Sequence, residues 1–266
     1  MNIFNDPGNL TALGIILALA FYFWWLARKT KGLPVPAPEP IPAPDGSIDY
    51  EDYYNNKYPK VDILYDGRKV PWRQGRYNID VRNFFNRYDS QVRKIVDTII
   101  FNKDITDNNK ALLCLCWVID HVNYASDVNA DGSQTEYWNF AFETLLPRSP
   151  DSPRLFGDCE DMAILLANLI MASGVPYWKV RISAGDVDDG RGNAGGHCFV
   201  TFFDETRAIW VLLDACYYAN KFSVEQRKDY KQESFYKSTW FSWSECYCWA
   251  KDVRDVGKMN GVNANG

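Results

Sequence analysis

The clearest hydrophobic pattern in the chain is a helical one that follows Cys159. Apolar side chains recur at helical spacing through residues 162–170. The run stops at Gly174, with Pro176 just beyond it, which is a common way for a helix to end. The pattern therefore predicts a buried helix whose first turn contains Cys159. Two further helices are predicted upstream, one after Asp89 and one over residues 107–122.

After this helix the period changes from helical to alternating. Apolar residues alternate around residues 178–182, 199–203 and 210–214. Such runs are typical of strands, and we expect the three to pair in antiparallel fashion. The glycine-rich segment 185–196 between the first two runs is predicted to be a mobile loop. By contrast, residues 49–88 show little clear period and are expected to wrap the domain irregularly.

The N-terminal segment has a different pattern, because residues 10–27 carry no charge. As a helix they would span about 27 Å, close to the roughly 30 Å of a bilayer's hydrocarbon core. A cleaved signal peptide is the alternative, but the segment lacks a basic leader and a clear cleavage site. We predict a membrane anchor in residues 1–31. The basic residues after it predict a single-pass protein whose following domain lies on the cytoplasmic side.

A proline-rich segment at residues 32–48 follows the predicted anchor. Its alternating prolines favour an extended polyproline spacer, and a docking motif for a proline-reading partner is the alternative. The predicted organisation is an anchor at 1–31, a linker at 32–48, one domain at 49–256 and a flexible, glycine-rich tail at 257–266.

Composition narrows the class of protein. The chain has 266 residues, of which 47% are hydrophobic and 15% aromatic, so it can bury a substantial core. Its net charge of -5 and the lack of a long basic stripe argue against a nucleic-acid partner. Seven cysteines occur without the paired spacing of a structural zinc site. They are therefore read as free thiols, most of them packed as small apolar residues.

The candidate chemistry centres on Cys159, which stands among Asp158, Glu160 and Asp161. A cysteine at a helix N-terminus is favoured as the thiolate by unpaired backbone N–H groups and the helix dipole. His197 and Asp214 follow on the predicted strands, so thiol, imidazole and carboxylate occur in the order of a nucleophilic site. An inert buried cysteine is the alternative reading of Cys159 alone.

The ordered set of motifs resembles the transglutaminase-like superfamily over roughly residues 90–220. The motifs that carry this resemblance are Gly157-Asp158-Cys159-Glu160-Asp161, Gly174-Val175-Pro176, Val180-Arg181, Gly196-His197, and Trp210 before Leu213-Asp214, with Trp138 and Glu143-Thr144-Leu145 upstream. The form of the cysteine motif is most similar to that of the bacterial transglutaminase-like cysteine proteinases.

This resemblance implies an α+β fold with a papain-like or transglutaminase-like core, in which the cysteine helix packs on an antiparallel sheet. It implies Cys159 as nucleophile, His197 as general base and then acid, and Asp214 as the group that orients the imidazole. The oxyanion donors would be the backbone N–H of Cys159 and a side chain matched by Trp138, although Trp138 is equally suited to the core.

The implied function is a thiol enzyme that cleaves peptide or isopeptide bonds of a protein or peptide substrate through a thioester on Cys159. The alternatives are a crosslinking acyltransferase, in which an amine resolves the same thioester, and a structural protein that keeps the fold without turnover. The sequence carries no signal of oligomeric state.

Calcium enters as a hypothesis, because some proteinases of this family depend on it. Asp158, Glu160 and Asp161 should raise the pKa of Cys159 by charge repulsion, and a bound cation would cancel that effect. The hypothesis is a calcium site that uses Asp158 and Glu160, with the loop from Asp127 to Asp131 as a further source of ligands. The loop 127–133 has oxygen donors at the first, third and fifth positions of a calcium loop, but Trp138 replaces the glutamate expected at the twelfth. The triad itself requires no cofactor, and the acids alternatively serve only the helix N-terminus.

Overall fold

The computed structural model of the chain describes residues 49–69, 76–102, 104–127, 136–147, 154–259 and 262–265. The predicted anchor at 1–31 and linker at 32–48 lie outside these residues. In the part that is described, the chain forms no helix of the length and apolarity needed to cross a bilayer. The localisation as a single-pass membrane protein is corrected by this finding, and we do not retain it.

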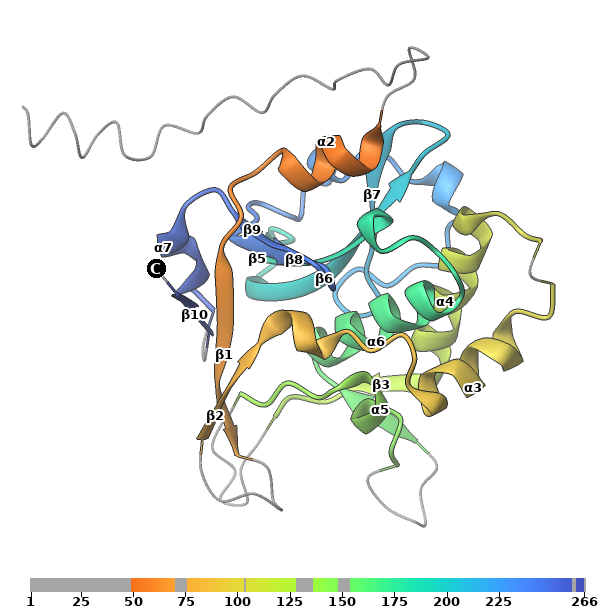
Figure 1. Cartoon of the computed structure of the whole chain (residues 1–266), viewed down its shortest axis with the longest axis horizontal. Helices are drawn as coiled ribbons and strands as arrows, with labels where there is room; N and C mark the ends of the chain where they lie inside the picture. Colours follow the sequence, from red (N-terminus) through yellow and green to blue (C-terminus); the bar gives the residue numbers. More distant parts are fainter. Residues whose placement is uncertain are drawn as a thin grey trace, which may run out of the picture. The chain divides into compact units, whose positions relative to one another are not determined.

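A five-stranded antiparallel sheet forms the centre of the fold (Figure 1). Its strand order is β7 (Ile209–Leu213), β6 (Ala194–Asp204), β5 (Val180–Asp188), β8 (Phe241–Trp243) and β9 (Cys248–Ala250). The three predicted strands are thus present and antiparallel, except that Trp178, which was expected in the first of them, lies in a short 3-10 helix (Tyr177–Lys179) before β5. The segment 185–196, however, is mostly strand, because β5 and β6 pair from Val180–Phe202 to Asp188–Ala194. Backbone pairing therefore replaces most of the predicted mobile loop.

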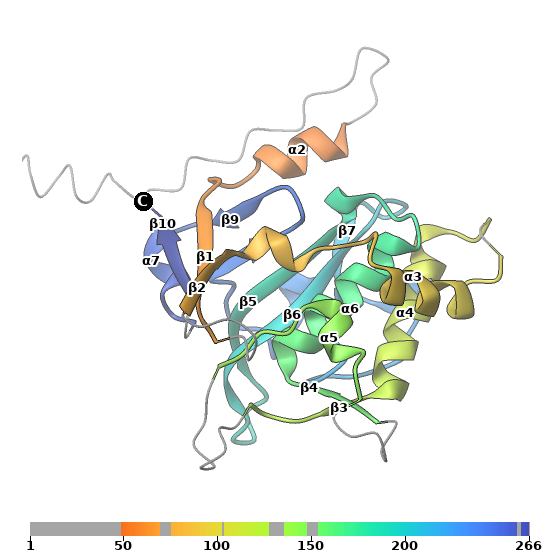
Figure 2. The same cartoon turned by 60° about the horizontal axis from the view of Figure 1, so that its bottom comes forward.

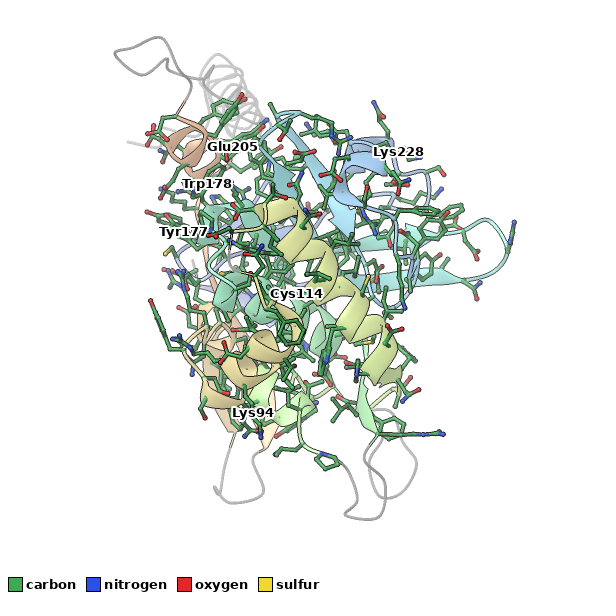
Figure 3. All side chains as sticks on the ribbon, turned by 90° about the vertical axis from the view of Figure 1, so that its right-hand side faces the viewer. Lys94, Cys114, Tyr177, Trp178, Glu205 and Lys228 are labelled. Atoms are coloured by element: carbon green, nitrogen blue, oxygen red, sulfur yellow. The ribbon has the colours of Figure 1, made fainter. Side chains whose placement is uncertain are left out.

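A layer of helices covers one face of this sheet (Figure 2). The cysteine helix α6 (Cys159–Ala172) packs on β5 and β6, and α3 (Ser90–Ile99), α4 (Asp107–His121) and α5 (Ala141–Thr144) pack around it. Every residue of α6 from Glu160 to Met171 is buried. Because the sheet packs on one side of α6 and the other helices pack on its other side, α6 forms the centre of the core. Cys114 of α4 is fully buried there (Figure 3), as predicted for a packed thiol.

The opposite face of the sheet is covered in part by α2 (Tyr50–Asn56) (Figure 1). Side chains alternate between the two faces along each strand. On β5, Val180 and Ile182 belong to the core cluster shared with α6, and Arg181 between them points to the α2 side. A second apolar cluster on that side contains Tyr54, Trp178, Phe203 and Trp210.

Two smaller sheets complete the described structure. β1 (Asp62–Lys69) lies between β2 (Arg76–Asp80) and β10 (Val262–Asn265), and β3 (Val122–Tyr124) pairs in parallel with β4 (Leu155–Gly157). The short helix α7 (Val253–Val256) precedes β10. The described residues between 49 and 88 therefore include one α-helix and two strands, where irregular structure was expected. Part of the predicted tail at 257–266 is a strand paired with β1.

Candidate active site

Cys159 is the first residue of α6, and the chain reaches it from β4 through Gly157 and Asp158. Gly157 leaves no room for a side chain, since a Cβ there would lie 2.7 Å from the Cβ of Asp161. The Sγ of Cys159 donates a hydrogen bond to Oε2 of Glu160 at 3.0 Å. Burial, and then the charge of Glu160, raise the pKa of Cys159 well above its usual value. These surroundings favour the protonated thiol. A raised pKa is what the neighbouring acids predict, whereas the helix N-terminus alone predicts a lowered one.

His197 and Asp214 form a buried pair at the end of the sheet. His197 lies on β6 and Asp214 directly follows β7, and Nε2 of His197 is 2.6 Å from Oδ2 of Asp214. Both side chains are nearly inaccessible to solvent. Oδ1 of Asp214 accepts hydrogen bonds from the backbone N–H of Cys216 and Tyr217 at 2.8 and 3.2 Å. The imidazole and the carboxylate that the sequence order suggested as partners are therefore in direct contact in the structure.

The charge state of Asp214 is fixed by these contacts. Burial opposes its ionisation, but the charge of His197 and hydrogen bonds from His197 and Tyr236 outweigh burial and hold the pKa of Asp214 below its usual value. The pair is therefore built around an ionised carboxylate. Such a carboxylate orients an imidazole and stabilises its protonated form.

The thiol lies next to the strand that carries the imidazole. The backbone of Cys198, the residue after His197, lies close enough to the thiol of Cys159 to oppose in part the rise of its pKa. Between Cys159 and His197 themselves, both of which are described, no hydrogen bond is present, because the thiol is bonded to Glu160. Cys159 and Gly196 line one cavity of about 510 Å³. The structure therefore brings thiol and imidazole to the same end of α6 and β6, with the thiol held by Glu160.

Three carboxylates gather in this cavity. One oxygen each from Asp127, Asp158 and Glu160 lies within 4.8 Å of the others. Asp158 and Glu160 are buried, and Oδ1 of Asp158 has no hydrogen-bond partner. Burial, and then the charge of Asp127, raise the pKa of Asp158 to about 7. Burial and the charge of Asp158 raise the pKa of Glu160 well above its usual value. This arrangement is costly for the carboxylates alone and fits a hard cation with oxygen ligands.

Asp161 has a separate role from this cluster. Its two carboxylate oxygens accept hydrogen bonds from the backbone and side-chain N–H groups of Asn139 at 2.7 and 2.5 Å. It therefore ties the segment before α5 to the first turn of α6. Of the predicted calcium loop, only Asp127 is described, since residues 128–135 lie outside the described ranges.

Trp138 lies in the aromatic core. It is fully buried, stacks between Tyr65 and Trp243, and its indole N–H donates to Oε1 of Glu136 at 3.0 Å. Glu136 in turn lines the cavity of Cys159. The indole donor is thus engaged by a carboxylate at the edge of the site, and its role as an oxyanion donor stays a prediction.

Two residues of the site were not found by sequence reasoning. The hydroxyl of Tyr236 donates to Oδ2 of Asp214, and Glu136 joins the acids that face the cavity. Tyr236 belongs to an aromatic C-terminal region that has no regular spacing, so nothing in the sequence distinguishes it from its neighbours. Glu136 follows an acidic loop whose path the sequence does not fix.

Comparison with known proteins gives structural neighbours only. No family model and no curated protein matches the sequence. The calcium-bound structure of LapG from Legionella pneumophila is 19% identical, covers 64% of this chain and 83% of its own, and has a TM-score of 0.44. A second LapG structure is 19% identical, covers 67% and 91%, and has the same TM-score.

A candidate cysteine protease from Cytophaga hutchinsonii is 16% identical and covers 70% of this chain and 52% of its own, with a TM-score of 0.39. The function proposed below rests on the residues of this chain.

Proposed function

We propose that the protein is a thiol enzyme of transglutaminase-like type that cleaves peptide or isopeptide bonds through a thioester on Cys159. The observation that supports this proposal is the buried His197–Asp214 pair, 2.6 Å apart, beside the start of the helix that carries Cys159. A buried imidazole held by an ionised carboxylate is the arrangement that general-base activation of a thiol requires.

In the proposed reaction, Asp214 accepts the Nε2–H of His197, which leaves Nδ1 as the basic nitrogen of the ring. Nδ1 takes the proton of Cys159, and Sγ attacks the carbonyl carbon of the scissile bond. The imidazolium then gives its proton to the departing amine, and a thioester remains on Cys159. Water hydrolyses the thioester, which releases the acid and restores the thiol.

This sequence of steps begins only when the thiol leaves Glu160. While Sγ donates to Oε2 of Glu160, its proton is not shared with His197, and the negative surroundings oppose the thiolate. We propose that Asp158 and Glu160, with Asp127, hold a calcium ion. A bound calcium ion supplies positive charge that lowers the pKa of a neighbouring thiol. Glu160 as a ligand would no longer be available to accept from Cys159.

The nucleophile is tested by alkylation of the full-length protein with iodoacetamide, followed by peptide mass spectrometry. We expect His197→Ala to slow the alkylation of Cys159, because the imidazole no longer removes its proton. The exposed Cys246 is an internal control whose rate should stay constant. An unchanged rate at Cys159 in His197→Ala would overturn the proposed pair.

The calcium proposal is tested by the same measurement with calcium and with a chelator. We expect calcium to speed alkylation of Cys159 in the wild type but not in Asp158→Asn, and to leave Cys246 unchanged. Equal rates at Cys159 in the two conditions would remove calcium from the mechanism without affecting the triad.

The type of acyl transfer is tested on a mixture of proteins incubated with wild type and with Cys159→Ala. New chain termini that depend on Cys159 indicate hydrolysis, which is the expected result. Crosslinks that depend on Cys159 would indicate transamidation instead, and neither product would favour a structural protein.

A further inference from the structure

A second cavity, of about 260 Å³, lies on the side of the central sheet that faces α2. Its described lining includes five cationic side chains and no carboxylate, in a chain whose net charge is -5. The cations are Lys57, Arg181, Lys231, Lys237 and Lys251. Such a concentration of one sign of charge in a hollow attracts anions. The proposed reaction takes place at the other cavity, although Tyr236, which donates to Asp214, lines this one.

Arg181 is the buried centre of this group. Only 5% of its surface is exposed, and its guanidinium lies 3.9 Å from the ring centre of Trp249 and 4.6 Å from that of Trp210. Nη2 donates to the carbonyl oxygen of Tyr54 at 2.6 Å, and Nε has no hydrogen-bond partner. No carboxylate among the described residues forms an ion pair with it. The two indole rings therefore hold a buried, uncompensated cation in place.

Arg227 shows what a purely structural buried arginine looks like in the same protein. It is also nearly buried, but its Nε, Nη1 and Nη2 donate to the backbone carbonyls of Phe222, Leu212 and Asn220. Its donors are thus used to fix a loop. Arg181 makes one such bond and leaves Nε free. A buried donor without a protein partner calls for an explanation, and a bound ligand is one.

The lysines around the cavity add charge without acidic partners. No ion pair to a described carboxylate is formed by Lys57, Lys231, Lys237 or Lys251. Lys57 and Lys251 lie over tyrosine rings, and Nζ of Lys237 donates to the carbonyl oxygen of Ser234 at 2.7 Å. Four uncompensated ammonium groups beside one guanidinium favour a ligand with two negative charges over one with a single charge.

The remaining lining defines the rest of the ligand. Hydroxyl groups of Ser183, Thr201 and Ser242 stand on the strands, and the rings of Tyr58, Tyr230 and Trp249 surround them. Hydroxyls and a guanidinium fork suit the oxygens of a phosphate group, and aromatic rings suit a flat apolar group. We propose that this cavity binds a small organic phosphate monoester, with its phosphate on Arg181 and its organic part against the aromatic rings.

The test is calorimetric titration of the full-length protein at fixed ionic strength with phenyl phosphate, inorganic phosphate and benzoate. We expect phenyl phosphate to bind more tightly than either of the others, because only it has both a dianionic group and a ring. No heat of binding with phenyl phosphate would overturn the proposal. Equal affinity for phenyl phosphate and inorganic phosphate would overturn the proposal that the ligand is an ester and would indicate a site for free phosphate.

Variants locate the binding. Arg181→Met keeps the unbranched stem between the indole rings and should weaken phenyl phosphate binding by about 10- to 100-fold. Should this variant fail to fold, the double variant of the exposed residues, Lys231→Gln with Lys237→Gln, replaces it. We expect it to bind phenyl phosphate more weakly, with an affinity that depends less on salt concentration. Unchanged affinity in these variants would overturn the assignment.

Two controls separate this site from other surfaces. Lys94 lies on α3 in the helical layer (Figure 3), and Lys94→Gln removes a surface charge away from the cavity, so it should bind as the wild type does. Cys159→Ala should also bind as the wild type does. Cys159 lines the other cavity, where the surrounding carboxylates repel anions, so phenyl phosphate should not bind there. A loss of binding in either control would contradict the proposed location.

Discussion

Replacing Asp158 by asparagine should stabilise the fold at alkaline pH when divalent cations are absent. The pKa of Asp158 rises from 3.8 to about 7 through burial and the charge of Asp127. A carboxyl whose pKa is raised in the folded state costs nothing below the unfolded pKa. It then destabilises the fold increasingly as pH rises toward the folded pKa. Because each pKa unit is worth about 1.4 kcal/mol, the loss at pH 8 reaches at most about 4 kcal/mol.

The measurement is urea unfolding followed by tryptophan fluorescence at pH 4 and pH 8, with a chelator present. The free energy of unfolding of Asp158→Asn relative to wild type should increase between these pH values by up to about 4 kcal/mol. Asp97→Asn on α3 is the matched control, since Asp97 is exposed and its replacement should not change the pH dependence.

Calcium sharpens this test. A cation bound by Asp158 and Glu160 stabilises the ionised carboxylates, so calcium should raise the stability of the wild type at pH 8 and leave Asp158→Asn nearly unchanged. If wild type and Asp158→Asn show the same change in stability between pH 4 and pH 8 in chelator, the reasoning about buried acids is refuted.

Three further substitutions test the packing around the site. Tyr236→Phe removes one donor to the buried Asp214 and should cost about 1–3 kcal/mol of stability, measured as a lower urea midpoint. Leu165→Ala, at a fully buried position of α6, should cost about 2–5 kcal/mol in the same assay. A loss below about 1 kcal/mol would contradict the packing described. Gly157→Ala places a Cβ 2.7 Å from the Cβ of Asp161 and should cost about 1–3 kcal/mol of stability. Gly195→Ala is the control, because a Cβ there meets no atom within 4 Å, whereas Gly190 is unsuitable because of its positive φ.

Much of the fold around Cys159 was predictable because local signals agree with the tertiary structure. Asp89 does cap α3, with Oδ1 accepting from the N–H groups of Gln91 and Val92. Gly174 does end α6 with a positive φ of 95°. The alternating runs became β5, β6 and β7. Both faces of β6 and β7 carry buried apolar side chains, because Phe202 and Val211 belong to the cluster that contains α6 residues, whereas Phe203 and Trp210 belong to the cluster on the α2 side.

The elements that sequence reasoning missed are those whose formation depends on distant partners. β8 and β9 are three residues each, and their conformation depends on the pairing of β8 with β5 and of β9 with β8. α2 is a seven-residue helix that is held by Tyr54 against Phe203 and Trp210. Within the site, the bond from Tyr236 to Asp214 depends on where the C-terminal loop returns, and no local pattern encodes that.

The pairing of β1 with β10 has a consequence for the order in which the chain folds. Ile63 lies opposite Ala264, so one edge of β1 is completed by residues that are very distant from it in the sequence. Until they pair, the hairpin of β1 and β2 has an open edge that can pair with another chain. Contacts so distant in sequence also close a very long loop, which makes them slow to form. We expect this sheet to close late in folding, and a variant that lacks residues 262–265 to aggregate while the α6 core still assembles.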